Sequence, residues 1–530
     1  MQTSQREEVT IDDALQKSIG EFGAGQRFIW FLAGLVMIPA AMQNFSMVFT
    51  GMDPVRQGWW ACNSDADESC SSVRSQAQPD ICSLPNSSWH WTSRRYSIVS
   101  DWDLICGDAW KLQVVNTAFF VGALGGTVIF SWLAEEFGRR RTLGMACAMT
   151  ALFGLCSALA PSYWWYLALR CMAGAGVAGI TSTAFLVAVE SVGPAWRGVA
   201  VLGSGYGSTA GACLLPLMAY LLPGWRALTL VTSALVALVL CTVVPSVPES
   251  PRWLLMTGRK GDATAGLAAI ASRNKTHLPE APLADAAASV AARRSLLDIM
   301  GNARLRRRII LVLYTTCFVN MAYYGVTLLI GSMSGDLHLN QLLGFLVEAP
   351  AIAATTLSIG RLGRRSTAAF LLLQGGTACM LCAVTHGWLQ LVFVTACKLG
   401  ITGALVLGPL YAEELFPGNV RSAASRVCSL AGRLGAIGAP GFVLLGSATG
   451  ATFVPYITFG SLILLAGFGT PALPETLDAP SPESVQDMGA PLRQYKLSSL
   501  RHIFRTRSCL PGSLHKTFMR TTDSDPDETA

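Results

Sequence analysis

The stretch that decides the fold reads Glu135-Glu136-Phe137-Gly138-Arg139-Arg140-Arg141 and directly follows an apolar run near 112–133. Its glycine and first two arginines recur as Gly363-Arg364-Arg365, 225 positions later. At an offset of 224, Trp164, Glu190, Arg197, Gly211 and Pro216 recur as Trp388, Glu414, Arg421, Gly435 and Pro440. The shared order and nearly constant offset indicate an internal duplication.

The composition around this repeat is that of a membrane protein. Of the 530 residues, 52% are hydrophobic and 14% are charged, and the mean hydropathy is +0.43. A soluble chain carries about 25% charged residues. The shortage excludes a cytosolic enzyme, a disordered regulator and a solvent-exposed repeat array.

Twelve apolar runs are long enough to cross a bilayer, whose hydrocarbon core needs about 20 apolar residues. They lie near 28–50, 112–133, 143–160, 163–186, 198–222, 227–247, 309–331, 338–358, 367–386, 388–411, 423–446 and 450–472. Six fall in each repeat, and an even number makes the two halves parallel. The sequence therefore predicts an all-α membrane protein with twelve transmembrane helices in two six-helix bundles.

Loop charges predict the orientation, because Lys and Arg concentrate in short cytoplasmic loops. Arginines follow spans 2, 4, 8 and 10, whereas the opposite short loops hold almost none beyond Arg226. Both termini are therefore expected in the cytosol. The expected division is a cytoplasmic N-terminal segment 1–27, a bundle 28–248 with an extracytoplasmic loop 51–111, a cytoplasmic linker 249–308, a bundle 309–472 and a cytoplasmic tail 473–530.

The predicted outer loop contains Cys62, Cys70, Cys82 and Cys106. An even set of cysteines in an oxidising compartment predicts two disulfides, although four cysteines allow three pairings. Asn86 opens the glycosylation pattern Asn86-Ser87-Ser88 in the same loop. We expect Asn86 to carry a glycan.

The Gly-Arg-Arg strings, with Pro248-Glu249-Ser250-Pro251-Arg252 after span 6, resemble the major facilitator superfamily over essentially the whole chain. Finer strings are similar to the organic cation/carnitine transporters, especially the plant type. These are Ile81-Cys82-Ser83-Leu84-Pro85, Ser100-Asp101-Trp102-Asp103-Leu104-Ile105-Cys106, Tyr323-Tyr324-Gly325 and Val347-Glu348-Ala349-Pro350. The resemblance implies the major facilitator fold and a secondary active or facilitative transporter that works by alternating access.

Charged residues at the predicted cytoplasmic face are candidates for gating. A carboxylate one helical turn before Arg139 can pair with it, or with a helix end across the bundle interface. Glu190 with Arg197, and Glu414 with Arg421, occupy symmetric positions that suit the same role. The gating set is Glu135, Arg139, Arg140, Glu190, Arg197, Arg364, Arg365, Glu414 and Arg421. The alternative is that these charges only anchor the orientation.

Charges at membrane depth are costly, so they are candidates for substrate binding. Arg170 lies near enough to the end of its span to reach the interface, whereas Glu348, Lys398 and Arg433 lie near the middle of theirs. Tyrosine faces can hold a quaternary ammonium. The expected substrate-binding residues are Asn320, Tyr323, Tyr324, Glu348, Lys398 and Arg433. The alternatives are a structural pair of Glu348 with Lys398, and tyrosines that only pack.

Arg433 indicates which charge the substrate carries. By motif it lies where animal cation carriers of this resemblance have Asp and related anion carriers have Arg. We therefore expect a zwitterion such as carnitine, or a small organic cation, with a carboxylate facing Arg433 or Lys398 and an ammonium facing Glu348 and the tyrosines. An organic anion carrier and a non-transporting membrane receptor are the alternatives.

Other classes of chemistry find no support in the sequence. It shows no metal-ligand spacing and no nucleophile elbow, and its 6 histidines are scattered, so we expect neither an enzyme nor a metal site. No cofactor is expected, with a proton or sodium as the candidate coupling ion. The expected partners are the small-molecule substrate and membrane lipids, without nucleic acid, in the plasma or vacuolar membrane.

Overall fold

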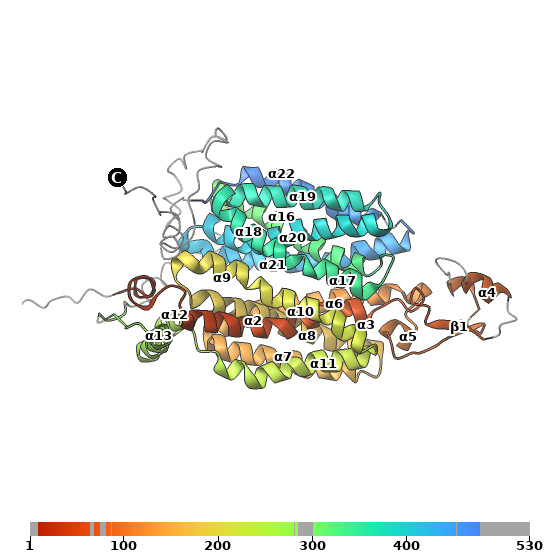
Figure 1. Cartoon of the computed structure of the whole chain (residues 1–530), viewed down its shortest axis with the longest axis horizontal. Helices are drawn as coiled ribbons and strands as arrows, with labels where there is room; N and C mark the ends of the chain where they lie inside the picture. The colour runs from red at the N-terminus through yellow and green to blue at the C-terminus, as the bar shows by residue number, and fades with distance from the viewer. Residues whose placement is uncertain are drawn as a thin grey trace, which may run out of the picture.

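The computed structural model describes residues 9–63, 68–74, 81–85, 87–279, 281–284, 300–451 and 453–477. Within these ranges the chain forms two helical bundles that lie side by side (Figure 1). The predicted glycosylation site Asn86 and the predicted tail beyond residue 477 lie outside the described residues.

The N-terminal bundle contains six spans, two of which are broken into two helices. They are α2 Ala24–Phe45 with α3 Met47–Thr50, α6 Trp110–Phe137, α7 Arg139–Ala158, α8 Tyr163–Glu190, α9 Arg197–Gly203 with α10 Gly205–Leu221, and α11 Trp225–Thr242. A short 3-10 turn, Pro194–Trp196, separates α8 from α9.

The C-terminal bundle repeats this plan with one broken span. Its helices are α16 Ala303–Ile330, α17 Leu337–Leu346 with α18 Glu348–Leu362, α19 Arg364–Cys382, α20 Gly387–Leu415, α21 Gly418–Ala448 and α22 Val454–Gly469. Every predicted apolar run corresponds to one of these spans, with ends that differ by a few residues. The two-bundle, largely α-helical architecture is confirmed.

Eleven spans in the described residues are long and apolar enough to cross a membrane, one fewer than predicted. The exception is α19, which opens with Arg364 and Arg365 and carries Gln374 in its middle. The Gln374 amide donates to the Ala396 carbonyl of α20 at 3.0 Å. A neighbouring helix thus accepts a hydrogen bond from the Gln374 amide nitrogen, although the Gln374 Oε1 atom is buried without a partner among the described residues. α19 completes the bundle without a fully apolar sequence.

The break between α17 and α18 has a local cause. Pro350 has no N–H to give to the carbonyl four residues earlier, and its ring clashes with that carbonyl. The helix therefore stops at Leu346 and restarts at Glu348. Glu348 lies in the first turn of α18, where the helix dipole favours a carboxylate.

The segments outside the bundles have more structure than the sequence predicts. The linker forms α12 Pro251–Met256 and α13 Lys260–Asn274, and α16 begins five residues before the predicted linker end. The N-terminal segment forms α1 Ile11–Ala14 followed by a π-helical turn, Leu15–Ile19. α12 and α13 lie at one end of the bundles (Figure 1). We call this end the clamp face, and the opposite end, which carries residues 51–108, the loop face.

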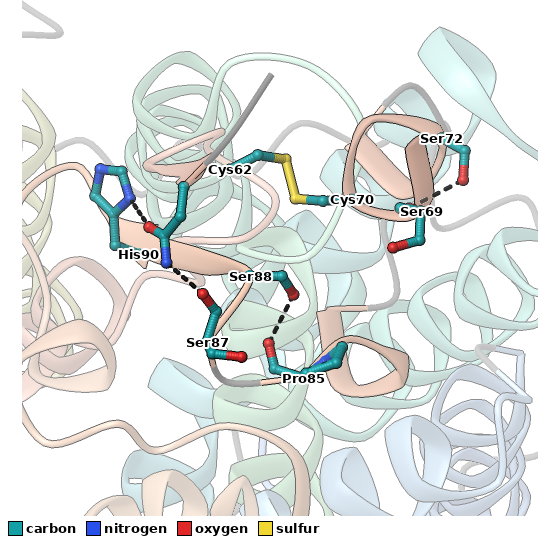
Figure 2. The surroundings of a disulfide bond; sticks show 9 residues. Cys62, Ser69, Cys70, Ser72, Pro85, Ser87, Ser88 and His90 are labelled. Atoms are coloured by element: carbon teal, nitrogen blue, oxygen red, sulfur yellow. Dashed lines mark hydrogen bonds between the residues drawn. A yellow bond between two sulfur atoms is a disulfide. The ribbon is translucent and has the colours of Figure 1, made fainter. Parts of the chain in front are cut away.

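The loop face carries a small disulfide-bonded unit that departs from an all-α fold. Strands β1 Trp60–Cys62 and β2 Trp89–Trp91 pair antiparallel, beside α4 Glu68–Arg74. Disulfides join Cys62 to Cys70 and Cys82 to Cys106, which selects one of the three possible pairings. Figure 2 shows the first disulfide beside the His90 ring and the Ser87–Ser88 turn.

The two bundles contact each other near both faces. Near the loop face, the rings of Phe45 in α2 and Phe345 in α17 lie 4.9 Å apart between centroids. Near the clamp face, Leu202 of α9 packs with Leu407 and Leu410 of α20. The bundles are therefore joined by apolar contacts near both ends.

Candidate functional site

The first charged cluster lies where α7 begins at the clamp face. The Arg139 guanidinium donates to both Glu190 carboxylate oxygens, with the shortest contact 2.7 Å from Nη2 to Oε1. The Arg139 backbone N–H donates to Glu249 Oε1 at 2.6 Å. Arg139, Glu190 and Glu249, which we call the first clamp, tie α7, α8 and the segment after α11 together.

A second clamp repeats this geometry in the C-terminal bundle. Arg364 Nη2 donates to Glu414 Oε1 at 3.0 Å, and the Arg364 backbone N–H donates to Glu475 Oε1 at 2.7 Å. The second clamp, Arg364 with Glu414 and Glu475, ties α19, α20 and the segment after α22. The duplication visible in the sequence is thus a duplication of hydrogen bonds.

The glycine before each clamp arginine is required by its backbone and by the carboxylate beside it. Gly138 has φ +92° and Gly363 has φ +86°, a region that non-glycine residues rarely adopt. A Cβ at Gly138 would lie 2.7 Å from Glu249 Oε2, and one at Gly363 would lie 2.6 Å from Glu475. Only glycine lets each carboxylate reach the helix N-terminus.

Two expected pairings at this face are wrong. Glu190 pairs with Arg139 and not with Arg197, and Glu414 pairs with Arg364 and not with Arg421. Arg197 instead pairs with Asp12 at 2.6 Å. Since α8 ends at Glu190 and α9 starts at Arg197, no continuous helix brings this pair together.

The remaining gating candidates bond to backbone groups or lie at the bundle interface. Arg140 Nη2 donates to the Pro245 carbonyl at 2.8 Å, the Arg365 backbone N–H donates to Glu475, and Arg421 Nε donates to the Phe416 carbonyl at 3.4 Å. Glu135 pairs with Arg426 of α21 at 2.9 Å. Among the described residues, this is the one ion pair that joins the two bundles.

Arg139→Ala and Arg364→Ala should each leave the protein folded and slow transport several-fold. Each change removes the partner of a glutamate in a charge network that fixes one bundle's clamp face. Uptake rates normalised to surface expression would measure the effect. Arg141→Ala, next to the first clamp but with an exposed side chain, is the control. Wild-type rates in both well-expressed variants would show that the arginines only set topology.

A buried ion pair lies between the two faces, inside the C-terminal bundle. Lys398 Nζ lies 2.8 Å from Glu348 Oε1 and 3.0 Å from Thr327 Oγ1. The Tyr323 hydroxyl donates to the same Glu348 oxygen at 2.9 Å, and Lys398 Nζ lies 4.1 Å from the Tyr323 ring centroid. Lys398 is fully buried and Glu348 is 4% exposed. Glu348 and Lys398, which were expected to bind substrate, therefore neutralise each other. This is the structural pair that the sequence left open as the alternative.

The residues predicted on span 7 divide between two surroundings. Tyr324 faces the other bundle, where its hydroxyl lies 3.3 Å from Asn44 Nδ2 and its ring lies 4.5 Å from the Phe120 ring. Asn320 donates to the Thr316 carbonyl of its own helix at 2.8 Å. The structure brings Tyr324 to the interface between bundles and places the Asn320 amide against Gly432 of α21 in its own bundle.

Arg433 also reaches across the interface. Its Nη2 donates to Thr181 Oγ1 of α8 at 3.3 Å. Within the described part of the chain, no carboxylate lies within ion-pair distance of Arg433. Among the described residues its guanidinium therefore contacts a neutral hydroxyl and no carboxylate, which makes it the candidate with the most capacity for a negatively charged ligand.

Three polar contacts thus join the bundles at the candidate substrate residues. They are Arg433 to Thr181, Asn44 to Tyr324, and Thr209 Oγ1 to Glu348 Oε2 at 3.4 Å. In each, an amide or hydroxyl of the N-terminal bundle contacts a residue of the C-terminal bundle. A polar ligand that entered between the bundles would take the place of these groups, so we call the three contacts the central site.

Arg170 lies in the N-terminal bundle, close to Gln43. It is 1% exposed, its Nη1 and Nη2 each contact Gln43 at 3.3 Å, and its guanidinium lies 4.7 Å from the Phe119 ring centroid. The Arg170 guanidinium therefore stays inside the bundle and does not reach the membrane–water interface, contrary to the expectation from its place in the span.

Among the described residues, no group of three or more His, Cys, Asp or Glu side chains could hold a metal ion.

Sequence reasoning missed several partners in these clusters. Glu249 and Glu475 carried a signal, because they recur within Pro-Glu-Ser and Pro-Glu-Thr strings at the end of each repeat. No sequence pattern marks Asn44, Thr181 or Thr209, since isolated amides and hydroxyls are common in transmembrane helices.

Comparisons with known proteins show the family and the fold. A family model described as sugar (and other) transporter matches residues 66–483. The chain is 32% identical over 496 residues to organic cation/carnitine transporter 4 of Arabidopsis thaliana, covering 89% of this chain and 90% of the relative. It is 28% identical over 566 aligned positions to human organic cation/carnitine transporter 2, covering 96% and 99%.

Solved structures share the fold at low sequence identity. The inward-open xylose transporter XylE from E. coli matches with a TM-score of 0.61 and 15% identity, covering 87% of this chain and 99% of that one. XylE bound to 6-bromo-6-deoxy-D-glucose, described as a major facilitator superfamily proton:xylose symporter, matches with a TM-score of 0.59. The predicted major facilitator fold is confirmed.

Proposed function

The chain belongs to the organic cation/carnitine transporters of the major facilitator superfamily, and from this premise we propose that it carries a small zwitterion across the membrane by alternating access. The family and the fold are those of transporters and not of enzymes. The proposed substrate has a carboxylate and a quaternary ammonium, as carnitine does.

The lack of a carboxylate beside Arg433 in the described part of the chain carries this proposal. A cation at membrane depth is costly unless a negative charge or strong acceptor accompanies it, and Thr181 supplies only a neutral oxygen. A substrate carboxylate would replace that hydroxyl with a charge-assisted hydrogen bond. Lys398 is a weaker candidate for the same role than the sequence indicates, because Glu348 already neutralises it.

The ammonium end of the substrate would lie against aromatic rings. Tyr324 stands between the rings of Phe45 and Phe120, at centroid distances of 6.2 and 4.5 Å. Aromatic faces attract a quaternary ammonium without requiring it to donate a hydrogen bond. Glu348 Oε2, whose partner Thr209 lies at 3.4 Å, would add negative potential nearby.

Two other substrates and one other class of function compete with this proposal. An organic cation would be attracted to the aromatic rings and Glu348 but repelled by the positive charge of Arg433. An organic anion would be attracted to Arg433 and would gain nothing from the rings or Glu348. A non-transporting receptor would not need the paired clamps in both halves. A clamp in each bundle supports moving bundles, so transport is the function that we propose.

Uptake into reconstituted vesicles tests the function. Carnitine, a monocation without a carboxylate and an organic anion would each be offered with and without pH and sodium gradients. We expect substrate-dependent flux that is highest for the zwitterion. A gradient effect would identify a proton or sodium as the coupling ion. Absence of flux for all three substrates would favour the receptor.

We propose that the clamp face is cytoplasmic and that residues 51–111 face the exterior or a lumen, in the plasma or vacuolar membrane. Arginine enrichment at the clamp face supports this orientation, and so does the presence of two disulfides on the loop face.

In intact cells that carry the protein at their surface, an impermeant maleimide should label it only after mild reduction. Reduction frees the four loop cysteines, and a variant with all four replaced by serine is the control. Asn86→Gln should also increase mobility on a gel by removing a glycan. Maleimide labelling of the loop cysteines that required permeabilised cells would reverse the orientation.

A further inference from the structure

The first described residues of the chain, 9–23, lie as a strap across the clamp face of the N-terminal bundle. Ala14, Leu15 and Ile19 of the strap are buried. The Gly193 backbone N–H donates to the Glu21 carbonyl at 3.0 Å, which fixes the strap to the connection between α8 and α9. The strap is therefore a packed part of the N-terminal bundle.

Asp12 of the strap holds two arginines at once. It accepts a hydrogen bond from Arg197 Nη2 at 2.6 Å and another from Arg252 Nη2. Burial alone would raise the pKa of the Asp12 carboxyl, but the bonds and charges of Arg252 and Arg197 outweigh it and lower this pKa. Asp12 therefore stays ionised at physiological pH. Without it, the two guanidinium groups would face each other unneutralised.

Arg197 stands at the interface between the bundles. The next residue, Gly198, lies against Leu410 of α20, with its Cβ position 3.6 Å from a Leu410 methyl. Glu413 follows Leu410 by three residues, so it lies one turn further along the same face of α20. Its carboxylate interacts electrostatically with Arg197 of the other bundle and Arg421 of its own.

Glu413 has no ion-pair partner within 4.0 Å among the described residues. It is also not part of the duplicated scaffold, because its counterpart 224 positions earlier is Val189. Glu414 has a counterpart in the first repeat, Glu190, whereas Glu413 has no acidic counterpart. Glu413 is thus a second carboxylate near the interface that belongs to neither clamp.

We propose that Glu413 is a gating residue that binds Arg197 across the interface whenever Asp12 releases it. In the present structure Asp12 keeps Arg197 on the strap, and the Arg197 to Glu413 bond is not made. Making that bond would join α9 to α20 and hold the bundles together at the clamp face. The strap therefore sets how firmly this face closes, through competition of two carboxylates for one guanidinium.

Asp12→Asn and Glu413→Gln, alone and combined, test this competition. Hydrogen–deuterium exchange of the full-length protein in nanodiscs would follow peptides from α9 and from the end of α20. This readout requires no substrate. The consequence for transport rests on the proposed function, but the exchange measurement does not, so the two can fail separately. Asp13→Asn is the matched control, because Asp13 is an equally exposed neighbour that pairs with Lys17 of the strap and with neither arginine.

Asp12→Asn should slow exchange in the α9 and α20 peptides by about five-fold or more, the size of an ordinary coupling between two sites. Exchange in the strap itself should become faster. Adding Glu413→Gln should return the α9 and α20 peptides to the wild-type rate, although it restores no contact. A purely structural role for Asp12 predicts faster exchange in all three regions and no rescue.

Either faster exchange at the interface in Asp12→Asn, or an unchanged Asp12→Asn effect after Glu413→Gln, would overturn the proposal. If Asp12→Asn does not fold, Glu413→Arg in the otherwise native chain replaces it. The new charge would repel Arg197, so exchange in α9 and α20 should become faster. Unchanged exchange in folded Glu413→Arg would equally contradict a role for Glu413.

Discussion

Lys398→Met is expected to cost about 3–5 kcal/mol of folding stability, the usual cost of breaking a buried ion pair by removing one partner. The Glu348 carboxylate would remain buried, with only the Tyr323 and Thr209 hydroxyls to stabilise its charge. Thermal unfolding in detergent or nanodiscs would measure the loss. The double variant Glu348→Gln/Lys398→Met should recover much of it, because no uncompensated charge remains.

Lys111→Met, which removes a partly exposed ion pair with Asp108, is the control and should cost less than about 1 kcal/mol. Equal losses in the two variants would contradict a buried pair.

Arg433→Gln is expected to weaken uptake of a carboxylate-bearing substrate about ten-fold or more, and to spare or improve uptake of a monocation without a carboxylate. A hydrogen bond to a charged group contributes roughly 1.5–3 kcal/mol, and each 1.4 kcal/mol is about a factor of ten in affinity. Competition of both substrate types against labelled carnitine would measure the difference. Arg433→Lys, which keeps the charge, should retain the preference for the carboxylate.

Arg426→Gln is the matched control on the same helix. Arg426 pairs with Glu135 at the clamp face, and both side chains are about half exposed. Its loss should change transport of both substrates alike and should not change their ratio. Equal losses of both substrates in Arg433→Gln would identify a structural arginine and remove the charge argument. Glu348→Gln is not a clean reciprocal test, because it would leave Lys398 buried and unpaired.

The spans could be predicted because length and apolarity along the chain decide which segments cross a membrane. The pairings at the clamp face could not. Glu190 and Arg197 are seven residues apart, a spacing that puts two side chains on one face of an unbroken helix. The 3-10 turn Pro194–Trp196 breaks that helix, so Arg197 faces Asp12.

The sequence marked one member of each central-site contact, Arg433, Tyr324 and Glu348, but neither their partners nor their arrangement. Charge within a transmembrane span is rare enough to mark Glu348, Lys398 and Arg433 from the sequence. Which of them neutralise each other depends on how α18, α20 and α21 pack, and a single sequence gives no distances between helices. The same limit applies to Thr181, whose hydroxyl is an ordinary side chain until α21 brings Arg433 to it.

The two clamps have a mechanical consequence. Each ties the ends of two helices and the following segment of its own bundle, so a bundle cannot bend at the clamp face without losing several charged hydrogen bonds. Two stiff bodies that touch near both ends and in the middle can separate at one end by pivoting about the contacts that remain. The hydroxyl and amide contacts of the central site are the weakest of these polar contacts, so a pivot there would break few strong bonds.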